Sequence, residues 1–391
     1  MSQFSKKYYL FLIVFLGLLA AFGPFVTDMY LPTLPALADI FHASASQVQL
    51  GLSTSMLGLA VGQIFFGPLS DKYGRRPVLI ASLLLFSVST VGCVFSPDID
   101  VFNMARFAQG LGGSGGIVLA RSISTDAYTG RDLAKILGII GAVVGIAPVA
   151  APVVGGLVSE SVGWQGIFWI LFGLGVMLLI MCLIFRETHP QERRHKGSVL
   201  SLVKSFGATL KIKQYVIFTL LFGFASGVLF AYVASASFVI QNVFGYSELA
   251  FSLLFAVNAS GIGIGSVLCL KLSSMRSAAV CGSVIVVVAA ALQGAFYLMG
   301  NPFIAYEILC FTMLLGVGFL FTSASAIAME EGRQHVGAAA AMLGAGGFLF
   351  GGVVSPLVGL GDMMQTSLIV IGICALVCLW LSVAGRKGRH E

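Results

Sequence analysis

Charged side chains are scarce in this chain. Asp, Glu, Lys and Arg make up 10% of its 391 residues, and 58% of the residues are hydrophobic. Soluble domains carry roughly 25% charged residues, so a soluble globular protein is excluded. The composition predicts a polytopic membrane protein.

Motifs of enzyme and metal chemistry are also scarce. The sequence has no HExxH, and its seven cysteines form neither a CxxC pair nor a Cys/His cluster with metal-ligand spacing. The net charge of +6 is spread over short segments between apolar runs rather than gathered on one domain, which argues against a nucleic-acid partner. We therefore expect no enzyme, no metal and no cofactor. A membrane-embedded enzyme remains the alternative from another class.

Apolar runs of about 20 residues, the length that crosses ~30 Å of hydrocarbon as a helix, occur twelve times. They cover 8–32, 46–68, 77–95, 101–122, 134–158, 164–185, 214–240, 248–270, 277–299, 303–327, 336–358 and 364–385. The first run follows Lys6 and Lys7 but is longer than a signal peptide and contains Asp28, so it is expected to be an uncleaved span.

Basic residues set the expected orientation, because Lys and Arg are retained in short cytoplasmic loops. With the N-terminus inside, 21 of the 22 Lys and Arg residues fall in cytoplasmic segments, and Arg106 in the fourth span is the exception. The outer loops contain acids such as Asp98 and Glu160 and no basic residue. Both termini are expected in the cytoplasm, with membrane lipids around the spans.

The longest polar interval divides the chain. It predicts an N-terminal six-helix bundle at 1–186, a cytoplasmic linker at 187–213 and a C-terminal six-helix bundle at 214–391. A shift of 203 residues superposes several positions of the two halves, including Gly58 on Gly261 and Gly62 on Gly265. Two parallel six-span halves with a substrate site between them are a known transporter architecture.

Three motifs resemble those of the major facilitator superfamily. The turn after the second span matches G-x4-D-x-[YF]-G-R-[RK] at Gly67, Asp71, Gly74, Arg75 and Arg76. Arg106 to Gly110 is similar to the R-x2-Q-G signature of its drug:proton antiporters. A proline and glycine motif in the fifth span looks like the antiporter motif and comprises Pro148, Pro152, Gly155 and Gly156.

With the sequence around Asp28, these motifs resemble the Bcr/CflA drug-resistance branch. The resemblance implies the major facilitator fold, an all-α membrane protein of twelve helices in two pseudo-symmetric bundles. It also implies a monomer in the bacterial cytoplasmic (inner) membrane that exports small amphipathic compounds or drugs in exchange for protons. A proton-coupled transporter of a neutral metabolite, such as a nucleoside, sugar or amino acid, is the alternative.

Two segments depart from the family pattern, one in each half of the chain. The loop after the eighth span, at 271–276, retains little of the gating signature. In the fifth-span motif, Ala147 and Ala151 stand where the family has glycines.

Asp28 and Arg106 are predicted to be the proton-coupling residues. Each lies about five residues, or ~7 Å along a helix, below the outer face, so they are level in depth. A neighbouring guanidinium favours the charged carboxylate, so moving either partner changes proton affinity. A static ion pair that only fixes packing is one alternative, and an outer-rim position of Asp28 is another.

A cavity between the halves is expected to be lined mainly by apolar and aromatic groups with a few polar ones. The candidate substrate-binding residues are Phe25, Tyr30, Gln109, Phe224, Tyr232, Asn258 and Glu307. Ordinary helix packing is the alternative for each aromatic residue. A carboxylate at the membrane rim is the alternative for Glu307.

Overall fold

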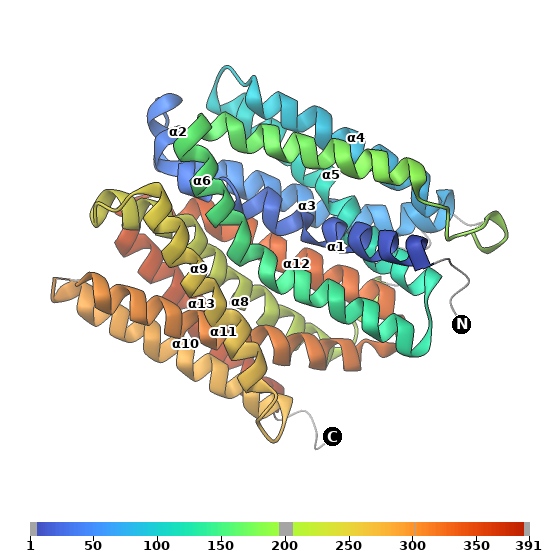
Figure 1. The fold of residues 1–391 in the computed structure, drawn as a ribbon. Helices are drawn as coiled ribbons and strands as arrows, with labels where there is room; N and C mark the ends of the chain where they lie inside the picture. Colours follow the sequence, from blue (N-terminus) through green and yellow to red (C-terminus); the bar gives the residue numbers. More distant parts are fainter. Residues whose placement is uncertain (1–5, 195–205, 301, 387–391) are drawn as a thin grey trace.

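The computed structural model describes residues 6–194, 206–300 and 302–386, which form helices and turns without a strand (Figure 1). In lipid each backbone N–H and C=O must find its partner within the segment, so apolar runs fold as helices. Ten helical stretches of the described chain are long and apolar enough to span a membrane. The predicted all-helical membrane fold is confirmed.

The long helices follow the predicted spans closely. They are α1 (Lys6–Asp28), α3 (Ala45–Tyr73), α4 (Arg75–Val94), α5 (Ile99–Ala127), α6 (Gly130–Ile184), α8 (Lys213–Phe238), α9 (Glu248–Cys269), α10 (Met275–Leu298), α11 (Phe303–Glu331), α12 (Val336–Val358) and α13 (Met363–Arg386). A short α2 (Leu34–Ile40) follows α1, and a π-helical turn (Val239–Val243) extends α8.

Helix α6 contains two of the predicted spans. It is 55 residues long and doubles back at Gly163, where φ is 72° and ψ is −178° (Figure 1). Side chains with a Cβ rarely adopt a positive φ, so glycine permits this reversal without a loop. The two predicted spans 134–158 and 164–185 are thus two helical segments that meet at the non-helical residue Gly163.

The helices form two groups (Figure 1). Helices α1 and α3 to α6 lie together, α8 to α13 lie together, and α6 crosses toward the second group. We call the end of the helices at Lys6 and Arg386 the terminal side, and the opposite end the far side. The predicted domain boundaries remain predictions, and residues 195–205 of the predicted linker lie outside the described residues.

The two groups are joined on the far side by hydrogen bonds that cross between them. Gln241 donates to the carbonyl of Pro32 at 2.8 Å, and Gln49 donates to the carbonyl of Ala234 at 3.1 Å. The hydroxyl of Ser159 lies 2.5 Å from the Glu248 carboxylate. These contacts close the far side of the molecule.

Candidate functional site

Arg106 is fully buried among α1, α3 and α5. Its guanidinium donates to the carbonyl of Val26 at 2.9 Å, to the carbonyl of Gly51 at 3.4 Å, and to Oε1 of Gln109. Three neutral acceptors therefore satisfy this cation, and none of the ion pairs among the described residues includes it.

The carbonyl of Val26 is available to Arg106 because α1 ends just beyond it, at Asp28. The last four carbonyls of a helix have no partner within the helix. Pro32 has no N–H with which to extend α1, and the chain continues as a 3-10 turn at Leu31–Thr33. A guanidinium at this end also complements the negative pole of the helix dipole.

Aromatic rings complete the surroundings of Arg106. Its guanidinium carbon lies 4.2 Å from the ring centre of Tyr30 and 5.7 Å from that of Phe168. Gln109, its neighbour one turn along α5, donates in turn to the hydroxyl of Thr90 at 2.8 Å. Tyr30 and Gln109 are both fully buried, so in this conformation they support Arg106 from within the first group of helices.

Asp28 does not pair with Arg106. It is 7% exposed, and its Oδ1 lies 2.7 Å from the Thr27 hydroxyl. Their pairing was inferred from equal depth alone, which does not fix the direction in which each side chain points, and no ion pair among the described residues joins the two. Arg106 reaches α1 through the main-chain carbonyl of Val26, whereas the Asp28 carboxylate contacts the Thr27 hydroxyl. The proposed roles of both residues in proton coupling remain predictions.

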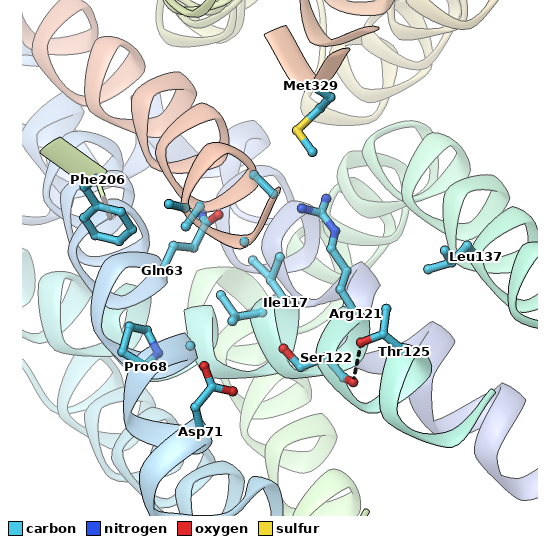
Figure 2. A pocket seen from close by; sticks show the side chains of 16 residues that line it. Gln63, Pro68, Asp71, Ile117, Arg121, Ser122, Thr125, Leu137, Phe206 and Met329 are labelled. Atoms are coloured by element: carbon cyan, nitrogen blue, oxygen red, sulfur yellow. Dashed lines mark hydrogen bonds between the residues drawn. The ribbon is translucent and has the colours of Figure 1, made fainter. Parts of the chain in front are cut away.

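A cavity of about 740 Å³ opens between the two groups on the terminal side (Figure 2). Helices α3, α5 and α6 line it from one group, and Phe206, α11 and α12 line it from the other. Its size suits a drug-sized molecule, since such pockets measure ~300–1,000 Å³. The structure thus combines hydrogen bonds between the two groups on the far side with a cavity between them on the terminal side.

None of the seven predicted substrate-binding residues lines this cavity. Three of them meet within the second group, where the Asn258 amide donates to the Tyr232 hydroxyl at 2.9 Å and to Glu307 Oε2 at 2.7 Å. The other carboxylate oxygen of Glu307 is buried without a partner. Phe224 packs on Phe350 with ring centres 4.7 Å apart, and Phe25 is half-buried against the core. Contact of these residues with substrate remains a prediction.

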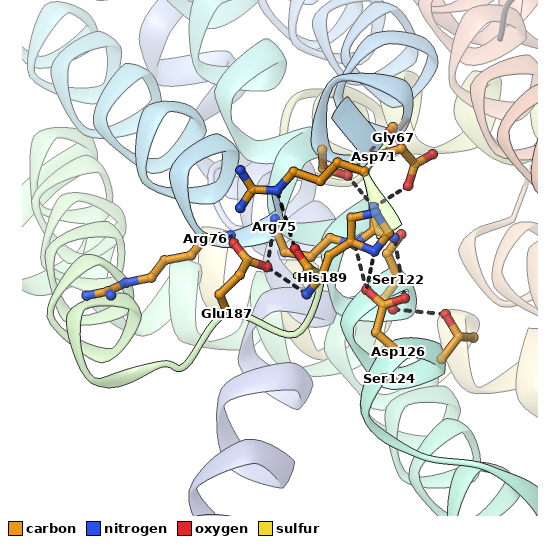
Figure 3. A network of polar contacts seen from close by, with 12 residues as sticks. Gly67, Asp71, Arg75, Arg76, Ser122, Ser124, Asp126, Glu187 and His189 are labelled. Atoms are coloured by element: carbon orange, nitrogen blue, oxygen red, sulfur yellow. Dashed lines mark hydrogen bonds and ion pairs between the residues drawn. The ribbon is translucent and has the colours of Figure 1, made fainter. Parts of the chain in front are cut away.

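The gating motif forms a connected set of ion pairs at the terminal ends of α3, α4 and α5 (Figure 3). Arg75 contacts Asp71 at 2.5 Å and Asp126 at 2.7 Å. Glu187 accepts from the backbone N–H groups of Arg75 and Arg76, each at 3.0 Å, and so caps the start of α4. Gly74, with φ of 98°, makes the turn between the two helices.

Sequence reasoning missed Asp126 and Glu187. Both are acids at the terminal side, where the basic residues of the motif need counter-charges. That complementarity was the available signal, but it could not identify which acids fold next to Arg75.

The glycines of the fifth-span motif lie where α6 meets two other helices. A Cβ at Gly155 would run into the carbonyl oxygen of Met29, and one at Gly156 would run into the side chain of Ser252 on α9. The motif prolines, Pro148 and Pro152, lie inside the same helix. The motif therefore brings α6 close to the end of α1 and to the second group.

Comparison with known proteins finds one family model that covers most of the chain. The family model described as Major Facilitator Superfamily matches residues 13–356. The chain is 36% identical over 364 residues to the uncharacterized MFS-type transporter YdgK of Bacillus subtilis, covering 92% of this chain and 90% of the relative. It is 27% identical to the bicyclomycin resistance protein homolog of Haemophilus influenzae, with 95% of each chain covered.

Other similarities cover less of the sequence or concern the fold alone. A chloramphenicol resistance protein of Pseudomonas aeruginosa is 33% identical over 66% of this chain and 61% of its own. A crystal structure of a bacterial homolog of the human lysosomal transporter Spinster covers 99% of this chain and 100% of its own, with a TM-score of 0.75 and 15% identity. The nucleoside transporter NupG covers 96% and 99%, with a TM-score of 0.71 and 17% identity.

Proposed function

Because the chain belongs to the Major Facilitator Superfamily, whose members are transporters and not enzymes, we propose that it exports small amphipathic compounds, including antibiotics, in exchange for protons. The observation that carries this proposal is the cavity of drug-sized volume between the two groups of helices. It opens on the terminal side, where nearly all basic residues lie, and basic residues mark the cytoplasmic face. The names of the relatives, bicyclomycin and chloramphenicol resistance, support such substrates.

In this proposal the terminal side is the cytoplasmic side of the bacterial inner membrane, and the protein acts as a monomer. Substrate enters the cavity from the cytoplasm or the inner leaflet. The contacts on the far side then open while those on the terminal side form, so that the substrate leaves outside. Exchange of one proton for one neutral molecule draws roughly 2.3 kcal/mol per 100 mV of membrane potential, besides the pH gradient.

Asp28 is proposed to take up and release the proton at the end of α1. A carboxylate is unfavourable at the C-terminal end of a helix, where the dipole is already negative, and protonation removes that repulsion. The same short segment carries the carbonyl of Val26, bonded to Arg106, and that of Pro32, bonded to Gln241 of the other group. The proton on Asp28 thus acts on a segment that holds the far side closed.

The test is uphill transport in proteoliposomes with an imposed pH gradient, using chloramphenicol, bicyclomycin and a nucleoside as substrates. We expect Asp28→Asn to abolish gradient-driven export while exchange of substrate across the membrane continues. Asp100→Asn makes the same change at an exposed acid in the first turn of α5 and should behave as the wild type. Undiminished uphill export by Asp28→Asn would refute the proton role, and transport of the nucleoside alone would refute the drug assignment.

A further inference from the structure

Two of the polar side chains that line the cavity on the terminal side are hydrogen-bond donors without a partner in the described chain. Arg121 of α5 is exposed to it and, among the residues that the structure describes, has neither an ion pair nor a hydrogen bond (Figure 2). A guanidinium is a pure donor with a permanent positive charge. Arg121 was expected to be only one of the basic residues that mark the cytoplasmic face.

A second donor lies deeper in the same cavity. Gln63 of α3 is 3% exposed, yet its Nε2 has no hydrogen-bond partner in the described chain. A Cβ at Gly344 on α12 would run into Gln63 Oε1, so the backbone of α12 covers the oxygen side of this amide. A buried amide donor without a partner costs ~1–3 kcal/mol, which a ligand that accepts its hydrogen bond would recover.

The two donors lie at different depths. Arg121 is six residues from the end of α5 at Ala127, and Gln63 is ten residues from the end of α3 at Tyr73. At 1.5 Å per residue these positions are about 9 Å and about 15 Å from the helix ends. A molecule entering from the terminal side meets Arg121 before it reaches Gln63.

The remaining surface of the cavity is largely apolar, including Ile117, Leu137, Phe206 and Met329. One acid, Asp71, also lines it, but the Asp71 carboxylate is engaged by Arg75 at 2.5 Å. Arg121 is therefore the one charged side chain of the lining that has no ion-pair partner among the described residues.

We infer that Arg121 and Gln63 form the polar end of the substrate site, and that this site takes amphipathic molecules whose polar group accepts hydrogen bonds and carries at most one negative charge. The inference rests on the proposed function, because it specifies which compounds that cavity accepts. Aryl carboxylates, phenolates and neutral nitro or carbonyl compounds belong to this class. Organic cations do not, because Arg121 repels them.

Equilibrium binding to the purified full-length protein tests this without any proton gradient. The probes are nalidixate, a monoanion at about pH 8, neutral chloramphenicol, and the tetraphenylphosphonium cation. We expect the wild type to bind the cation at least about tenfold more weakly than the other two. Arg121→Gln should weaken nalidixate binding about tenfold to a hundredfold, the range for hydrogen bonds to charged groups, and chloramphenicol binding less than about threefold.

Further variants distinguish the effect of the charge, the effect of the deeper hydrogen-bond donor and a general effect on folding. Arg121→Lys keeps the charge and should retain most of the affinity for nalidixate. Gln63→Leu removes the deeper donor and should weaken both nalidixate and chloramphenicol. Lys135→Gln removes a basic residue that is exposed on α6 outside the cavity and should leave all three affinities unchanged.

Three results would overturn the inference. The first is that the wild type binds the cation most tightly of the three probes. The second is unchanged nalidixate affinity in Arg121→Gln, and the third is an equal loss of affinity for all three probes in that variant. Failure of the proposed function gives a different result, since uphill export would then be absent while the charge preference in binding persists.

Discussion

Replacing Gly359 by alanine tests whether contact between α3 and α12 holds the far side closed. Gly359 follows α12, and a Cβ there would lie 2.5 Å from Oε1 of Gln49 and 2.7 Å and 2.8 Å from Cα and N of Ser46, both residues of the first turns of α3 in the other group. Carbon atoms in good contact are ~3.5–4.0 Å apart. The Gln49 side chain can move aside, but the two Ser46 atoms are backbone, so the two helices themselves must separate by about 1 Å.

The free-energy cost of this crowding gives the expected shift in the equilibrium between the closed and the open far side. Overfilling a well-packed contact costs ~1–3 kcal/mol. The cost applies only where α3 and α12 touch, so a conformation with the far side open does not bear it. Since 1.4 kcal/mol is a factor of ten, Gly359→Ala should favour the open far side by about fivefold to about 150-fold.

Spin labels at Phe95 and Leu298 report this opening by double electron–electron resonance. These residues are 70% and 85% exposed, at the far ends of α4 and α10 on opposite flanks of the molecule (Figure 1). Gly361→Ala is the control, because its Cβ would have as its nearest neighbour Oγ1 of Thr366 at 3.8 Å. The reasoning fails if Gly359→Ala leaves the distance distribution unchanged, or if Gly361→Ala changes it equally.

Three further outcomes follow from the buried contacts. Arg106→Lys keeps the charge but loses the forked geometry that reaches three acceptors, so uphill export should fall at least about tenfold, and wild-type rates would contradict this role. Glu187→Gln should lower the thermal unfolding midpoint by about 2–4 °C through loss of about 1 kcal/mol of capping, whereas Glu192→Gln at an exposed site should not. Glu307→Gln removes a buried carboxylate oxygen that has no donor, so thermal stability should be unchanged or higher, and a clear drop would reveal an overlooked partner.

Hydrophobic run length was sufficient to predict the helices but not their ends. The predicted spans 336–358 and 364–385 agree closely with α12 and α13, because lipid requires long apolar helices. Helix α5 runs to Ala127, five residues beyond the predicted span 101–122. Polar residues at the membrane surface can either extend a helix or form a loop after it, and hydropathy does not distinguish these two cases.

The site was harder to predict than the fold because it depends on rotation about the helix axes and on contacts between distant segments. Depth placed Asp28 and Arg106 level, yet their side chains do not meet. The basic pattern assigned Arg121 to the cytoplasmic surface, and Gln63 drew no attention, since a glutamine in an apolar run is unremarkable by sequence. Only the crossing of α3, α5 and α12 brings those two donors to one cavity.

The far-side contacts rely largely on main-chain acceptors. Gln241 and Gln49 bond to the carbonyls of Pro32 and Ala234, and Ser53 bonds to that of Gly352. A carbonyl is supplied by any amino acid, so the residues that accept these bonds can be exchanged without removing the acceptor. Such a gate leaves a lineage free to vary its specificity by mutation while the closing contacts persist, and the neutral acceptors of these three bonds make them insensitive to ionic strength.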